Sequence, residues 1–296
     1  PDGVSCIQIA TSFTFREFDM DTFPRTTVGG VSLSRLIIGT NWFLGWSHTS
    51  VAKDNLIKDT HDRGSIADAV CAFMEYGVDT VMGPLHPVLV DALADAEDRM
   101  GRKVVRIYTP VFNILPGGPA EKEPERVFDE CAKAGAVFCM PHQCVTDALL
   151  DRMHGVIRDI GRYTALIRER GMIPGLSTHM PEAVVYADKT GADVETYLQI
   201  YNAAGFLMQV EADWVMRIIS NAKKPVMTIK PLAAGKLLPP VGLAFSWSTI
   251  RPCDMVTVGT SSAAEAREVA ELSLDLLAHR VPSYQLQTTR SKQSLE

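Results

Sequence analysis

The feature that most constrains the fold of this chain is a regular alternation of short β-branched runs with longer amphipathic stretches, found eight times between residues 35 and 279. Runs rich in valine and isoleucine predict buried strands, and stretches with helical spacing of apolar side chains predict helices. Repeated strand–helix units build parallel sheets. Eight such units in 296 residues indicate one (β/α)8 TIM barrel, an α/β fold that commonly takes about 250 residues.

The strands are expected at residues 35–40, 80–83, 104–109, 136–140, 173–177, 206–210, 225–229 and 255–258. The helices are expected at 65–76, 87–100, 124–134, 146–170, 181–190 with 194–202, 213–221, 240–249 and 263–279. A glycine stands between a helix and the next strand in five places, where a left-handed cap residue is favoured: Gly77, Gly101, Gly135, Gly171 and Gly205.

A hairpin is expected ahead of the barrel, because residues 25–34 contain two alternating runs around Gly29 and Gly30, and paired glycines favour a tight hairpin turn. Such a hairpin could close the bottom of the barrel. The chain therefore divides into an N-terminal extension (residues 1–24), the barrel with its hairpin (25–280) and a polar C-terminal tail (281–296).

Composition excludes several classes of protein. The formal net charge is -6 and the basic residues are scattered, so no footprint for nucleic acid is present. No apolar run approaches the roughly 20 residues of a membrane span, and no leader pattern is present at the start, so a cytoplasmic location is expected. The six cysteines are dispersed, which predicts reduced thiols and no zinc knuckle.

Five regions of the sequence are similar to the aldo-keto reductase superfamily: residues 28–40, 139–147, 175–179, 209–211, and 230–235 taken with 259–262. The resemblance implies a barrel that binds NADP(H) and a small carbonyl substrate. It also implies cofactor contacts at Ser177, Gln209, Gly259, Ser261 and Ser262. A homo-oligomer is left open.

The resemblance fails at the catalytic tetrad of that superfamily, which consists of Asp, Tyr, Lys and His. Met82 stands at the aspartate position, the tyrosine position falls near Pro87, and Pro110 follows Thr109 where a lysine is expected. The histidine position alone is kept, by His142. Carbonyl reduction needs a proton donor at the substrate oxygen, so the usual donor has to be replaced.

Residues just past the strands point into the bowl of a barrel and are the candidate active-site residues. His86, His142, His179 and Glu211 together resemble a site for Zn, Mn or Fe, because imidazoles and a carboxylate suit these ions. The alternative interpretation is that each histidine is polar lining of the barrel mouth. His142, His179, Glu211, Lys230 and Asp54 are the candidates for catalysis, and Lys230 admits imine chemistry as a second role.

The segment after the first strand carries aromatic and polar side chains that suit a sugar or nicotinamide ring. Asn41, Trp42, Trp46 and His48 are therefore candidates for substrate contact. A hydrophobic lid or a subunit contact is the alternative interpretation of the aromatic residues.

Three functions are weighed on this basis. The leading hypothesis is metal-assisted lyase, isomerase or hydrolase chemistry on a small carbonyl or carbohydrate-type substrate. The second is an NADP(H)-dependent oxidoreductase with a modified site. The third is a barrel that binds a ligand without catalysis.

Overall fold

A computed structural model describes residues 22–282 and residue 292. Most of the predicted extension (1–24) and tail (281–296), and Cys6 within the extension, lie outside the described residues. The described part forms a parallel barrel, whose strands are β3 (Leu36–Gly39), β4 (Thr80–Gly83), β5 (Val105–Tyr108), β6 (Ala136–Cys139), β9 (Ile173–Pro174), β10 (Leu176–Thr178), β11 (Tyr197–Ile200), β12 (Val226–Ile229) and β13 (Met255–Gly259). The predicted TIM barrel is therefore confirmed.

The fifth barrel strand is divided into two pieces, and this division closes the barrel. β9 pairs with β6 on one side, and β10 pairs with β11 on the other. Gly175 joins the two pieces, and a Cβ atom there would lie 2.9 Å from the Thr196 side chain and 3.0 Å from Met140. A side chain would not fit at this junction without movement of its neighbours.

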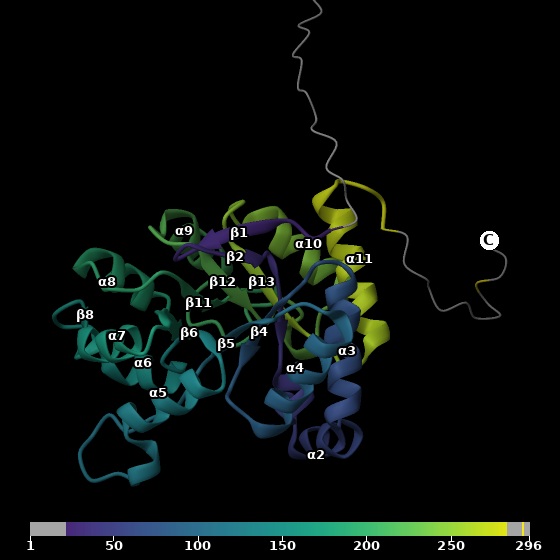
Figure 1. Cartoon of the computed structure of the whole chain (residues 1–296). Coiled ribbons are helices and arrows are strands. Elements are labelled where there is room, and N and C mark those ends of the chain that lie inside the picture. The colour runs from purple at the N-terminus through teal and green to yellow at the C-terminus, as the bar shows by residue number, and fades with distance from the viewer. Residues whose placement is uncertain (1–21, 283–291, 293–296) are drawn as a thin grey trace, which may run out of the picture.

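Helices surround the sheet (Figure 1). They are α3 (Arg63–Glu75), α4 (Pro87–Met100), α5 (Pro124–Lys133), α7 (Ile160–Glu169), α8 (Glu182–Thr190), α9 (Ala212–Asn221), α10 (Pro239–Thr249) and α11 (Ala263–Leu277). Short elements lie in the connections: α1 (Asn41–Leu44), α2 (Val51–Thr60), α6 (Gln143–Thr146), and the 3-10 turns η1 (Ala120–Lys122), η2 (Asp147–Leu149) and η3 (Ala233–Gly235). None of the helices in the described residues has the length and apolar character to cross a bilayer.

The predicted hairpin is present as β1 (Arg25–Val28) and β2 (Val31–Ser34), which pair antiparallel. Gly29 and Gly30 have φ values of 54° and 82°, the left-handed backbone that a tight hairpin turn requires. Val28 and Leu33 of the hairpin pack into the barrel interior. The buried side chains of that interior come from seven of the barrel strands and the residue after β6, namely Ile37, Met82, Ile107, Phe138, Met140, Leu198, Met227 and Met255, and the partly buried Ile173 of β9 packs against them.

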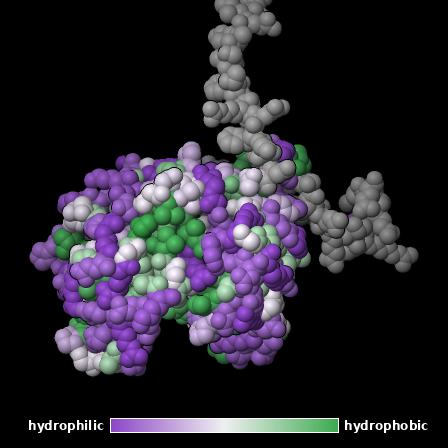
Figure 2. Space-filling view, viewed as in Figure 1, coloured by the Kyte–Doolittle hydropathy of each residue, from purple (hydrophilic) through white to green (hydrophobic). Residues whose placement is uncertain are grey.

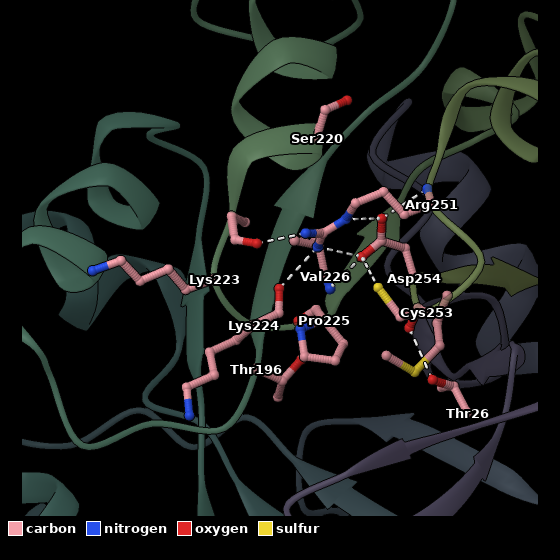
Figure 3. Close-up of polar contacts among 12 residues, drawn as sticks. Thr26, Thr196, Ser220, Lys223, Lys224, Pro225, Val226, Arg251, Cys253 and Asp254 are labelled. Carbon is pink, nitrogen blue, oxygen red and sulfur yellow. Dashed lines mark hydrogen bonds and ion pairs between the residues drawn. The ribbon is translucent and has the colours of Figure 1, made fainter.

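A polar network ties the bottom of the barrel together (Figure 3). The buried Asp254 carboxylate accepts hydrogen bonds from the Arg251 side chain at 2.7 and 2.8 Å and from the Val226 backbone N–H at 2.8 Å. Arg35, just before β3, donates to the Asp254 carbonyl at 2.9 Å. The network therefore joins the first, seventh and eighth strands at their amino ends.

The sixth strand was predicted in the wrong place. Residues 194–202 were expected to be helical, but Tyr197–Ile200 forms β11 and is buried along its whole length. A parallel strand that is covered on both faces is continuously buried, so short runs of this kind are ambiguous in sequence. The apolar residues 206–210 lie in the loop that follows, where Leu207 has a φ of 57° that a strand cannot accommodate.

The long helix predicted over residues 146–170 is also wrong in its first half. Residues 150–157 form a small hairpin of β7 (Leu150–Asp151) and β8 (Val156–Ile157), and α7 begins only at Ile160. The Asp151 side chain accepts hydrogen bonds from the Met153 and His154 N–H groups at 3.1 Å. This local turn competes with a helix.

Candidate functional site

A cavity of about 770 Å³ opens at the carboxyl ends of the barrel strands. These ends face the lower edge of Figure 1, where α2 lies, and the hairpin closes the opposite end of the barrel. Figure 2, drawn from the same side, shows this lower edge indented between two lobes. The cavity runs from the strand ends across the β13–α11 connection to the start of α10. Its volume is in the range of cavities that bind small molecules and cofactors.

Most of the residues that the sequence singled out line this cavity: Asn41, Trp42, Trp46, His48, His142, His179, Lys230, Ser177, Gly259 and Ser261. The remaining predicted residues, Asp54, His86, Gln209, Glu211 and Ser262, do not line it. His142, His179 and Lys230 follow correctly placed strands and line the cavity, whereas His86 also follows a correctly placed strand, β4, and lies outside it.

Lys230 and His48 form the polar centre of the cavity. The Lys230 ammonium nitrogen Nζ lies 2.9 Å from His48 Nε2, and the Asn41 amide nitrogen lies 3.0 Å from the same atom. An ammonium group has no lone pair to accept a hydrogen bond. His48 Nε2 is therefore the acceptor, and its proton resides on Nδ1.

Burial changes the protonation of this centre. Burial lowers the pKa of Lys230 to about 8. Burial, followed by the charge of Lys230, lowers the pKa of His48 to about 4 and that of His179 to about 3. The same two causes lower the pKa of His142. At neutral pH the cavity thus holds one cationic amine among three neutral imidazoles.

His142 is fixed in one tautomer by its neighbour Cys144. The backbone N–H of Cys144 donates to His142 Nδ1 at 3.3 Å, and the Cys144 sulfur lies 3.1 Å from the same nitrogen. An Nδ1 atom that accepts a backbone N–H carries no proton itself. The proton of the neutral ring is therefore on Nε2, which can donate to a ligand oxygen.

His179 is held in place through its backbone. Asp147, in η2, accepts a hydrogen bond from the His179 backbone N–H at 3.1 Å, and the Thr178 hydroxyl donates to the same carboxylate at 2.5 Å. Desolvation raises the pKa of Asp147. The end of β10 is thereby anchored to the segment that follows His142.

Asp54 shapes the segment that carries His48, although it does not line the cavity. Its carboxylate accepts hydrogen bonds from the Ser47 hydroxyl at 2.6 Å and from the Ser47 backbone N–H at 2.8 Å. These hydrogen bonds lower the pKa of Asp54. Asp54, predicted as a candidate for catalysis, therefore positions Ser47, the residue next to His48.

The four candidate metal ligands are not brought together. His86 is exposed at the start of α4, and Glu211 is exposed at the start of α9, whereas His142 and His179 line the cavity. Among residues 22–282 and 292, no group of three or more His, Cys, Asp or Glu side chains is arranged to hold a metal ion. The residues present do not fit the predicted metal, so no chemical step is derived through one.

The error in the sixth strand also misplaced the glutamine that was expected to contact a cofactor. Gln209 is exposed in the loop, while Gln199 of β11 is buried with no partner for its Oε1 atom among the described residues. The sequence signal for this strand is the short, mostly apolar run at residues 197–201, which does not by itself distinguish a strand from a helix. Glu265 and Glu268, on the first turns of α11, also line the cavity and were not predicted.

The cavity can be compared with known proteins once its geometry is clear. No family model and no curated protein matches the sequence. Solved structures match over most of the barrel. A Pseudomonas aeruginosa protein described as an aldo-keto reductase is 15% identical with a TM-score of 0.60, and the match covers 86% of this chain and 96% of that one.

Two further structures agree with this match. An aldo/keto reductase from Klebsiella pneumoniae in complex with NADP and acetate is 14% identical with a TM-score of 0.55, covering 89% of this chain and 98% of that one. An aldo/keto reductase from Brucella melitensis is 11% identical with a TM-score of 0.56, covering 88% and 95%. The fold of this chain is therefore that of the aldo-keto reductases, and the predicted resemblance is confirmed at that level.

Proposed function

Starting from this fold, we propose that the chain is a nicotinamide-dinucleotide-dependent oxidoreductase that acts on a small carbonyl or alcohol substrate with a replaced catalytic acid. The fold hosts reductases, one of them solved with NADP. A fold alone does not determine a reaction. The observation that carries the proposal is the Lys230–His48 pair, which lies in one cavity with His142. Lys230 follows β12, His48 lies in the segment after β3, and His142 lies just past β6.

The cavity residues fit a dinucleotide in their size and in their unused hydrogen-bonding groups. Thr257 and Thr260 line the cavity, and their buried hydroxyls have no partner among the described residues. Gly259 begins the connection to α11, and a Cβ atom there would lie 3.0 Å from Trp42. When bound, the dinucleotide would supply or accept a hydride.

Lys230 replaces the missing tyrosine in this proposal. A lysine whose pKa is about 8 is matched to proton transfer near neutral pH. The Nε2–H of His142 can orient the substrate oxygen, and His48 accepts a hydrogen bond that fixes the Lys230 ammonium. Trp42, Leu198 and Ile229 give the same cavity apolar walls.

The experiment is turnover with a panel of aldehydes, ketoses and oxidised sugar acids, followed by nicotinamide absorbance. We expect dinucleotide oxidation that depends on the carbonyl compound. Lys230→Met should lower kcat by about 10²- to 10⁴-fold, the usual contribution of a general acid, with little change in dinucleotide affinity. Lys236→Met is the matched control, because the Lys236 Nζ atom lies over the Phe206 ring at 4.3 Å and does not line the cavity.

The other functions considered from the sequence predict different outcomes. A barrel that only binds a ligand would show a bound small molecule without turnover. Lyase, isomerase or hydrolase chemistry would consume a carbonyl substrate without any change in nicotinamide absorbance. Either result, obtained with folded protein, would contradict the proposed oxidoreductase activity.

A further inference from the structure

The cavity has two chemically different ends. The inner end contains Lys230 and the three histidines. The outer end is lined by Leu237, Leu238, Glu265 and Glu268, which come from the approach to α10 and from the first turns of α11. Among the described residues, Lys230 is the only lysine or arginine in the lining. Within the described part of the chain, the lining of the outer end is therefore acidic and contains no lysine or arginine, and the Lys53 ammonium lies outside the lining, 5.4 Å from the centre of the Trp42 ring.

The start of α11 already has a carboxylate. The N-cap residue Ser262 accepts a hydrogen bond from the Glu265 N–H at 3.1 Å, and the Glu265 side chain accepts the Ser261 N–H at 2.6 Å. α11 is 15 residues long, and the positive end of such a helix favours an anion. In this chain the Glu265 carboxylate occupies the positive end of α11. It would therefore repel a phosphate dianion placed beside it.

Two polar groups at this end have no hydrogen-bond or ion-pair partner within residues 22–282 and 292. The Thr260 side chain is 3% exposed, and its hydroxyl has no hydrogen-bond partner in the described part of the chain. Glu268 is half-buried in the cavity wall, and neither a hydrogen bond nor an ion pair is found for its carboxylate within residues 22–282 and 292. A carboxylate accepts from hydroxyl donors, and a hydroxyl can donate or accept. A ribose diol offers both the donors that a carboxylate needs and the donors or acceptors that a threonine hydroxyl needs.

A dinucleotide whose reacting ring lies at Lys230 places its adenosine ribose toward the other end of the cavity. Ribose hydroxyls paired with an acidic side chain are the recognition mode for NAD, whereas a 2′-phosphate calls for an arginine. We infer that the outer end, through Glu268 and Thr260, binds the unphosphorylated ribose, so that this chain takes NAD(H) in preference to NADP(H). This inference rests on the proposed function.

Arg267 cannot supply the missing cation, although it lies on the same turn of α11. Its guanidinium forms a bidentate pair with Glu75 of α3, with both distances at 2.8 Å. The pair holds the Arg267 side chain against Glu75 of α3. Arg267 is therefore not available to neutralise the Glu268 carboxylate.

The test is titration of the purified full chain with NADH and with NADPH at fixed ionic strength, followed by nicotinamide fluorescence and by calorimetry. We expect NADH to bind at least about tenfold more tightly, because like charges brought together at an interface are strongly unfavourable. Glu268→Gln should reduce the ratio of NADH affinity to NADPH affinity, and Glu268→Arg should make NADPH the more tightly bound dinucleotide. Glu271→Gln is the matched control on the same helix, since Glu271 accepts from Tyr76 and lies outside the cavity lining.

The outcomes separate the two proposals. NADPH binding that equals or exceeds NADH binding would overturn the inference and leave the oxidoreductase intact. A preference for NADH that Glu268→Gln and Glu268→Arg leave unchanged would overturn the assignment to Glu268. If folded protein binds neither dinucleotide, both the inference and the proposed function fail.

Discussion

At the scale of single residues, the two members of the central pair share an unusual backbone. His48 and Lys230 have φ values of 60° and 62°, in the left-handed region that costs a residue other than glycine about 1–3 kcal/mol. Such conformations persist where surrounding structure holds them, and they cluster at functional sites. The positions of both side chains are therefore fixed by the fold, before any ligand binds.

The pH dependence of turnover should report the state of Lys230. The amine must be protonated to donate, so the rate of carbonyl reduction should fall as pH rises through about 8. Alcohol oxidation needs the neutral amine and should rise over the same range. Measuring kcat against pH in both directions checks this. A reduction rate that increases above that pH would instead indicate the neutral amine as a nucleophile.

At the scale of elements, prediction of the site depended on where each strand was placed. His142, His179 and Lys230 follow strands that the alternation located correctly, and all three line the cavity. Glu211 was assigned to the bowl only because the sixth strand was set several residues too late. Local patterns could not correct this error, since the burial that distinguishes a two-sided strand from a helix arises from tertiary contacts.

The close approach of β3 and β4 gives a test of one such contact. A Cβ atom on Gly83 would lie 1.7 Å from the Thr40 hydroxyl, so Gly83→Ala should destabilise the fold by about 1–3 kcal/mol through overpacking. Gly161→Ala, in α7 with open space around it, should stabilise by about 0.5 kcal/mol. Urea unfolding of both variants measures the difference. Equal midpoints would contradict the close contact at Gly83.

At the scale of the whole molecule, the sequence was sufficient for the architecture, because eight repeated units and a glycine-centred hairpin have few alternative arrangements. It was not sufficient for the acidic outer end of the cavity. Glu265 and Glu268 belong to α11, and their place in the cavity wall depends on how that helix packs against the rest of the barrel. Contacts between elements that are far apart in the sequence cannot be predicted from the local spacing of residues.

The network at the bottom of the barrel should contribute strongly to global stability. Asp254 is fully buried, and Asp254→Ala would leave the Arg251 charge without its partner, at a cost of about 3–5 kcal/mol. Glu130→Ala removes an exposed pair with Arg126 and should cost only about 0–1 kcal/mol. Chemical unfolding compares the two variants. A small effect at Asp254 would show that the network is not coupled to global unfolding.

The hairpin at the start of the barrel has a consequence for the kinetics of folding. Val28 and Leu33 pack with Met255, and the Thr26 hydroxyl donates to the Cys253 carbonyl, contacts that span nearly the whole described chain. Contacts between residues so distant in sequence form slowly, because a long loop must close first. The hairpin precedes every barrel strand in the sequence, but it can dock only after the eighth strand exists. Its docking therefore marks the moment at which the barrel closes.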